Sequence, residues 1–159
     1  MEHHPAIHPL LAALDEGFDH RSWHGTNLLG SLRSVTATQA CWRPAEQRHN
    51  IWETAVHAAY WKYVVWRTIA GAPRGSFPLK GSNWFPRSTA DEAAWKADLR
   101  LLKDQHRALR DAVAHLSPDR IDQLVPGKKV RLGFLIRGVA AHDLYHAGQI
   151  QLLKRLAQR

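Results

Sequence analysis

A stripe of apolar residues in the second half of the chain constrains the fold more than any other feature. Its members recur at alternating spacings of four and three residues: Trp95, Leu99, Leu102, His106, Leu109, Val113 and Leu116. This spacing is typical of the seam along which helices pack in a bundle. Ser88 or Thr89 is the expected N-cap of this helix, and Pro118 follows its end. We therefore predict a long helix that buries this stripe against other helices.

Three further segments carry a helical pattern of apolar residues. They run from about Pro9 to Val35, from Ile51 to Ala70 and from Leu132 to Ala157. Residues 36–50 are expected to form a connector, because Pro44 is unsuited to a helix interior. No segment has a convincing strand pattern. The sequence therefore predicts an all-α four-helix bundle, organised as a single domain over residues 1–159.

The segment between the second and third predicted helices is rich in glycine, proline and serine. It spans Ala72 to Thr89 and contains Trp84 and Phe85 between turn-forming residues. Long loops in compact domains often form lids or the walls of pockets. We expect Trp84 to pack back onto the bundle, chiefly as an anchor, and the loop to help form a pocket.

Composition and charge exclude several classes of protein. The 159 residues are 45% hydrophobic and 23% charged, which is ordinary for a soluble domain. The one cysteine, Cys41, allows no intramolecular disulfide and no cysteine metal site. The net charge of +8 raises the question of nucleic acid, but the basic residues are scattered, so we do not expect nucleic-acid binding. The N-terminus lacks the pattern of a signal peptide and no long apolar run occurs, so we expect a cytoplasmic protein without a membrane span.

Two histidines lie four residues apart in the last predicted helix, within the segment GVAAHDLYHAGQIQLLK. Residues at this spacing project from one face of a helix, so His142 and His146 can bind the same divalent ion. Asp143 is expected to point away from them, towards the surface. The third ligand has to come from elsewhere, and His57 in the otherwise apolar second helix is the best candidate. Such pairs also arise by chance, so a structural role for these histidines is the competing interpretation.

Other polar residues near the predicted site have two interpretations each. Glu53 lies one turn before His57, where it could orient a ligand or act as a catalytic base. It could equally complete a capping box with Asn50, the expected N-cap of the second helix. His24 and His106 fall on apolar stripes, and we expect both to be core histidines bonded to neighbouring groups.

Three histidine ligands indicate the type of metal and the type of site. Neutral imidazole nitrogens suit zinc, nickel and related divalent ions. A site with three protein ligands leaves coordination positions open for water or a substrate, which is typical of catalytic centres.

Three segments resemble the DinB-like superfamily of four-helix bundles, also described as DinB/YfiT-like metalloenzymes. They are HNIWETAVHAAYW, DEAAWKADLRLLKDQHRAL and GVAAHDLYHAGQIQLLKR, and the resemblance extends from about Leu10 to Arg155. It implies a metal bound by His57, His142 and His146, an unusual helix connectivity and a homodimer. Relatives include transferases that use low-molecular-weight thiols. The resemblance thus favours a metal-dependent thiol S-transferase or hydrolase acting on a small molecule; the alternative is a non-catalytic metal-binding or stress-related module.

Overall fold

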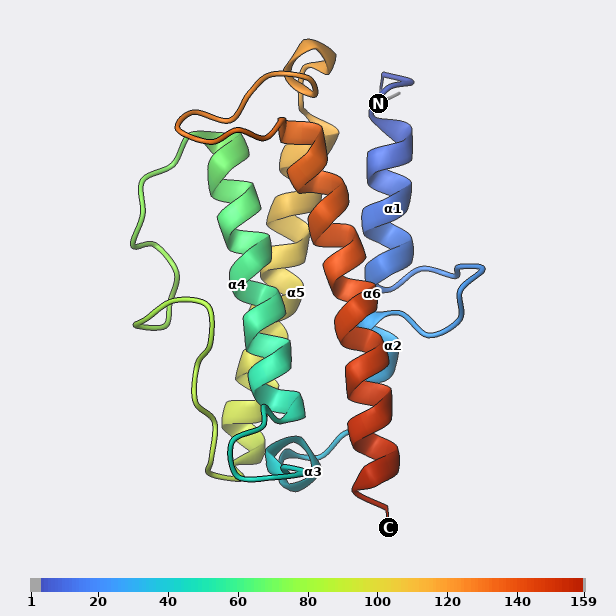
Figure 1. The fold of residues 1–159 in the computed structure, drawn as a ribbon, viewed down its shortest axis with the longest axis vertical. Coiled ribbons are helices and arrows are strands. Elements are labelled where there is room, and N and C mark those ends of the chain that lie inside the picture. The colour runs from blue at the N-terminus through green and yellow to red at the C-terminus, as the bar shows by residue number, and fades with distance from the viewer. Residues whose placement is uncertain (1–3, 159) are drawn as a thin grey trace.

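The computed structural model describes residues 4–158, and this part of the chain is helical (Figure 1). Its only strand-like pairing is an isolated bridge between Leu124 and Arg131. The all-α prediction is therefore confirmed. The elements in chain order are α1 (His8–Phe18), α2 (Leu28–Ser31), α3 (Ala37–Cys41), α4 (Ile51–Ala70), α5 (Glu92–Ala114), the 3-10 turn η1 (Pro118–Arg120) and α6 (Leu132–Leu156).

The four longest helices, α1, α4, α5 and α6, lie side by side, with α4 and α5 pointing one way and α1 and α6 the other (Figure 1). Because α4 and α5 are parallel neighbours, the chain has to return along the bundle between them. A 20-residue helix is about 30 Å long. The loop at residues 71–91 makes this return, which explains why the predicted Ala72–Thr89 loop is so long.

The predicted helix from Pro9 to Val35 is wrong in its extent. The chain leaves α1 after Phe18, and α2 begins only at Leu28. Gly25 in the intervening loop has a φ of 96°, which a helix does not allow. Both α1 and α2 pack on α6, so two short helices share the fourth position of the bundle. The predicted connector at residues 36–50 also contains a helix, α3.

Side chains set the ends of the longer helices. The Asn50 side chain accepts a hydrogen bond from the Glu53 amide at 2.8 Å, which confirms Asn50 as the N-cap of α4. Gly71 ends that helix in the left-handed conformation, with a φ of 65°. Helix α5 is capped by Asp91, not by Ser88 or Thr89 as predicted. A carboxylate is the stronger acceptor at the positive end of a helix, and Asp91 accepts from two backbone amides.

The interior consists of two apolar clusters with polar side chains between them. One cluster contains Trp52, Trp95 and Leu102, and the other contains Leu109 and Ile136. The predicted seam of α5 contributes to both clusters. The buried polar side chains between them are Lys62, His106, Asp143 and His146. Of the three predicted metal ligands, His146 belongs to this layer, and His142 and His57 lie next to it.

Candidate metal centre

The three histidines of the predicted site come together between α4 and α6. The Nε2 atom of His142 lies 3.1 Å from Nε2 of His57 and 2.9 Å from Nε2 of His146. One nitrogen of each ring lies within 4.8 Å of the others. His57 and His146 are buried and His142 is partly buried. The structure therefore gathers a group of three histidines that could hold a metal ion.

The outer nitrogens of two of these rings are held by acceptors. Nδ1 of His57 lies 2.8 Å from the Asn83 carbonyl oxygen, and Nδ1 of His146 lies 2.7 Å from Oε1 of Gln149. Because both partners are acceptors, each Nδ1 carries the proton and donates it. Each Nε2 is then left with a free lone pair directed into the cluster. This arrangement is the one found for histidines that bind metals.

Burial keeps these imidazoles neutral. It lowers the pKa of His57, and it lowers the pKa of His142 to about 3, with a further contribution from the neighbouring histidines and Lys62. The pKa of His146 falls to about 4 for the same main reason. A histidine has to be unprotonated to bind a metal. The cluster therefore meets this requirement at neutral pH.

The donor set fits a divalent metal ion. Because His57 and His146 are protonated on Nδ1, their Nε2 atoms carry lone pairs. Both lone pairs face Nε2 of His142 at about hydrogen-bond distance. Nδ1 of His142 is buried and has no hydrogen-bond partner within residues 4–158. At most one proton can lie among the three Nε2 atoms, so the cluster as a whole lacks positive charge. A divalent cation that accepts all three lone pairs would remove this deficit.

A family profile of the DinB superfamily matches residues 20–150 of the chain. The chain belongs to the DinB superfamily. Neither a search of curated proteins nor a search of solved structures gave a significant match. In this DinB superfamily member, no helix among the described residues is long and apolar enough to cross a membrane. The match confirms the resemblance carried by the three sequence segments.

The 71–91 loop of this DinB protein closes one side of the histidine cluster. Trp84 stacks on His57 with ring centroids 3.9 Å apart, and His49 stacks on the other face of Trp84 at 3.5 Å. The prediction that Trp84 packs back onto the bundle is confirmed. Trp61 donates a hydrogen bond to the Asn83 side chain at 3.0 Å. The loop thus places both the Asn83 carbonyl and an indole ring against His57.

Glu53 connects the start of α4 to this loop. Its carboxylate accepts hydrogen bonds from Arg43, from the Arg87 amide at 3.0 Å and from His49 at 3.0 Å. Burial alone would raise the pKa of Glu53, but the hydrogen bonds from these groups lower it to about 2. The side chain does not return to the Asn50 amide, so the capping box is wrong. Glu53 is an ionised residue that ties the loop to α4 near the histidines.

A second polar cluster lies next to the histidines and contains Lys62, Asp143 and His106. Lys62 donates to Asp143, and its Nζ lies 3.3 Å from Nδ1 of His106. Lys62 and Asp143 are fully buried, so the prediction that Asp143 faces the surface is wrong. Helix α6 is covered on more than one side, and the ammonium group of Lys62 makes burial of this carboxylate tolerable.

The two other candidate histidines differ from each other. His106 is buried, stacks on Phe18 with centroids 3.8 Å apart and contacts Lys62. It is therefore a core histidine, as predicted. His24 lies exposed in the loop between α1 and α2, with Ser22 as its neighbour. Its assignment to the core edge is wrong because the helix predicted there does not form.

Sequence reasoning missed Lys62 and His49. Lys62 had a detectable signal, since it lies seven residues after Ala55 and three after Ala59, on the apolar face of α4. A lysine at such a position calls for a buried acidic partner. His49 had no comparable signal, because its role depends on where the loop places Trp84.

Proposed function

We propose that this protein is a metal-dependent enzyme in which His57, His142 and His146 bind one divalent ion, most suitably zinc or nickel. The observation that supports the proposal is the convergence of three Nε2 atoms, two of them on rings whose Nδ1–H groups are already held by acceptors. A divalent ion at such a site lowers the pKa of a bound water or thiol and so supplies a nucleophile at neutral pH. The reactions that fit are thiol S-transfer, with a low-molecular-weight thiol, and hydrolysis of a small molecule.

The surrounding residues position this site. Asn83 and Gln149 fix the orientation of His57 and His146 through their hydrogen bonds to Nδ1. Trp84 covers one face of His57 and limits the access of water from that side. These contacts hold the nitrogen donors in place before any ligand arrives.

Glu53 is retained in the proposal as a candidate general base. Its pKa near 2 keeps it ionised at neutral pH, and it lies one turn before His57 on α4. Acting as a base would require one of its present hydrogen bonds to open. Replacing it by glutamine tests this role: turnover lost with metal content and folding intact supports it, and turnover retained argues against it.

Metal analysis tests the proposal directly. We expect the purified protein to contain about one zinc or nickel ion per chain, measured by inductively coupled plasma mass spectrometry. His57→Ala and His142→Ala should each remove the ion, because two remaining ligands rarely suffice. His24→Ala, which changes an exposed histidine, is the matched control and should keep full occupancy. Full occupancy in His57→Ala or His142→Ala would exclude that residue from the site.

The alternative function is a non-catalytic metal-binding or stress-related module. In that case the protein would bind the ion and turn over no substrate. A screen of thiol conjugation and hydrolysis with the metal-loaded protein, using His142→Ala as the control, separates the two. Turnover that depends on His142 supports the enzyme.

The exposed face of α6 supports a homodimer. Its large apolar members Phe134, Tyr145 and Leu152 are 59%, 65% and 58% exposed. Along this face, large and small exposed residues recur at spacings of four and three: Phe134, Gly138, Ala141, Tyr145, Gly148 and Leu152. This stripe is symmetrical about position 143, so an antiparallel α6 from a second copy would place Tyr145 opposite Ala141. Tyr145→Lys should then convert a dimer into a monomer in light scattering; a monomeric wild-type protein would contradict the proposal.

A further inference from the structure

A cavity of about 920 Å³ lies beside the histidine cluster, between α4, the first part of the 71–91 loop and the turn at residues 125–128. We call it the α4 cavity. Aromatic side chains form much of its wall, and these are Tyr60, Trp61, Tyr63 and Phe77. Its volume is in the range of sites that bind small organic molecules.

Four cationic side chains also line the α4 cavity: Arg67, Arg74, Lys80 and Lys128. None of the residues that line it is acidic, and among the described residues none of these four cations forms an ion pair. Nε of Arg67 is buried without a hydrogen-bond partner in residues 4–158. A buried guanidinium N–H without an acceptor is destabilising. An anionic ligand would supply both the missing acceptor and the missing charge.

Trp61 connects the α4 cavity to the histidine cluster. Its ring lines the cavity, and it lies edge-on to His57 and His142 with centroids 6.3 Å and 6.4 Å away. Ser82 also lines the cavity, and it immediately precedes Asn83, whose carbonyl oxygen accepts a hydrogen bond from His57. The cavity and the cluster therefore share a wall.

The geometry of α4 sets the length of a ligand that reaches both the α4 cavity and the histidine cluster. Arg67 follows His57 by ten residues on α4, which corresponds to about 15 Å along the helix axis. An extended peptide covers this distance with about four residues, since each adds about 3.5 Å. A ligand that contacts Arg67 and reaches the cluster is therefore elongated.

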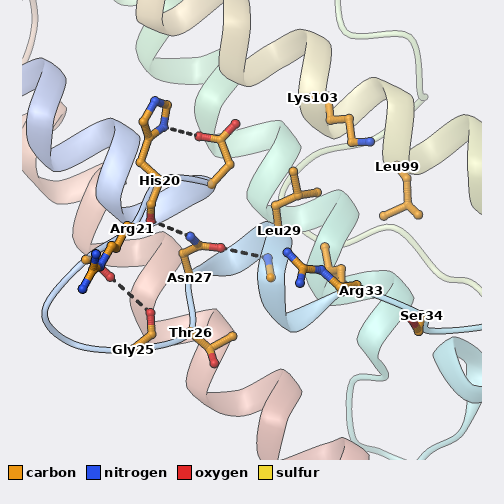
Figure 2. A pocket seen from close by; sticks show the side chains of 14 residues that line it. His20, Arg21, Gly25, Thr26, Asn27, Leu29, Arg33, Ser34, Leu99 and Lys103 are labelled. Carbon is orange, nitrogen blue, oxygen red and sulfur yellow. Dashed lines mark hydrogen bonds and ion pairs between the residues drawn. The ribbon is translucent and has the colours of Figure 1, made fainter.

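The cavity in Figure 2 provides a comparison within the same molecule. It measures about 780 Å³ and is lined by three cationic side chains, Arg21, Arg33 and Lys103. Its lining also includes an acid, Asp19, which pairs with His20 at 2.6 Å. None of its lining residues belongs to the histidine cluster or contacts it through an aromatic ring. It thus offers cations of the same kind without a connection to the site.

We propose that the α4 cavity binds an elongated organic anion, with carboxylate or phosphate groups near Arg67 and an apolar part along the aromatic wall, and directs the other end of that anion to the histidine cluster. This inference rests on the proposed metal-dependent function and names the substrate class for it. The aromatic wall contributes contact area, and the four cations select for charge.

Binding of model anions to the metal-loaded protein tests the inference. Isothermal titration calorimetry at low salt should detect biphenyl-4,4′-dicarboxylate, an elongated aromatic dicarboxylate, or biphenyl-4-yl phosphate, while the neutral diamide of the dicarboxylate should not bind. The anion that binds more tightly identifies carboxylate or phosphate as the preferred group. Arg67→Gln should raise the Kd of that anion about tenfold, the value of one charge-assisted hydrogen bond of about 1.4 kcal/mol.

Two further variants test whether the change in Kd comes from the cations of the α4 cavity. Arg74→Gln changes an exposed residue and should raise the Kd several-fold without affecting folding. The control, Arg33→Gln with Lys103→Gln, removes two cations from the cavity of Figure 2 and should leave the Kd within about twofold, since screening weakens distant charges. Equal weakening in the control, binding of the diamide as tight as that of the dicarboxylate, or failure of both anions to bind would overturn the inference.

Different variants should abolish metal binding and weaken anion binding, so the proposed function and the anion site can be tested separately. His142→Ala should lose the metal and still bind the anion, because no cation of the cavity is a candidate ligand. Arg67→Gln should keep the metal and lose affinity for the anion. A wild-type protein that binds the anion but no metal would therefore contradict the proposed function while leaving the cavity as an anion site.

Discussion

Two polar clusters lie next to each other in the bundle interior: the Lys62–Asp143–His106 group and the three histidines. They differ in whether the chain itself supplies a cation. In the first, the ammonium group of Lys62 faces a carboxylate and an imidazole nitrogen, so the chain supplies its own cation. In the second, three Nε2 atoms converge and no side-chain cation reaches them within residues 4–158. Helices α4 and α6 contribute to both clusters, and α5 adds His106 to the first. The comparison indicates that the first group is electrostatically complete within the chain, whereas the second could hold a cation from outside.

The largest expected effect comes from removing the cation of the first cluster. Lys62→Met leaves the buried carboxylate of Asp143 without its partner. Breaking such a pair costs about 3–5 kcal/mol, and we expect a loss of this size in the free energy of unfolding, measured by urea denaturation.

The double variant Lys62→Met with Asp143→Leu sharpens this result. It removes both charges and should recover most of the lost stability, because no uncompensated charge remains. If the double variant is as unstable as the single one, the pair does not act as a unit and the comparison fails.

The second expected effect is stabilisation by added metal. At a free zinc concentration 100 times its Kd, the free energy of unfolding should rise by about 2.7 kcal/mol. The rise should be absent in His142→Ala and present in Lys62→Met with Asp143→Leu, measured by thermal denaturation with and without a chelator. A response to zinc that survives in His142→Ala would show that the ion binds elsewhere.

A smaller effect is expected from the outer partner of His146. Gln149→Leu removes the acceptor of its Nδ1–H group and should weaken zinc binding about tenfold, which is the lower end of the range for such partners. Gln151→Leu is the matched control, because the Gln151 side chain has no hydrogen-bond partner among the described residues. A competition titration against a chromophoric chelator measures both Kd values. Equal values would exclude a supporting role for Gln149.

The smallest effect concerns pH and the first cluster. Burial, with the nearby positive charge of Lys62, lowers the pKa of His106 to about 2, whereas an unfolded histidine has a pKa of about 6.5. Below pH 6.5 the unfolded state binds the proton first, so the folded state loses stability as the pH falls towards 2. For the metal-free protein we expect this residue to contribute about 1 kcal/mol between pH 6 and pH 5.

His106→Leu tests that contribution by its effect on slope. The variant should show a shallower dependence of the free energy of unfolding on pH over this range, whatever its absolute stability. His24→Leu, at an exposed position, should leave the slope unchanged. An unchanged slope in His106→Leu would mean that His106 titrates alike in both states.

Local patterns in the sequence were enough to predict most of the fold. The spacing of residues 95–116 and the Asn50 cap gave α5 and α4, because both depend on neighbours along one helix. The helix expected from Pro9 to Val35 failed because Gly25 and the Asn27 cap redirect the chain there. Weak local preferences of this kind are decided by packing against α6, which sequence periodicity does not report.

The part of the histidine site that lies along a single helix was also predictable from local spacing. His142 and His146 share a helix face, so their pairing follows from geometry. His57 was the best candidate for the third ligand because it lies in an otherwise apolar helix, and the resemblance to the DinB family supported it. The hydrogen bond from His57 to Asn83 and the stacking of Trp84 depend on the path of an irregular loop. Asp143 was misplaced because its burial depends on Lys62, which is distant in sequence.

The parallel arrangement of α4 and α5 has a consequence for how the site is assembled. His57 and His142 are 85 residues apart in sequence, and the loop that holds His57 has to cross the length of the bundle. Contacts of such long range form late in folding, because their loop entropy has to be overcome first. We therefore expect metal capture to follow docking of the helices, so that the rate at which a refolding chain takes up zinc reports the final step of folding.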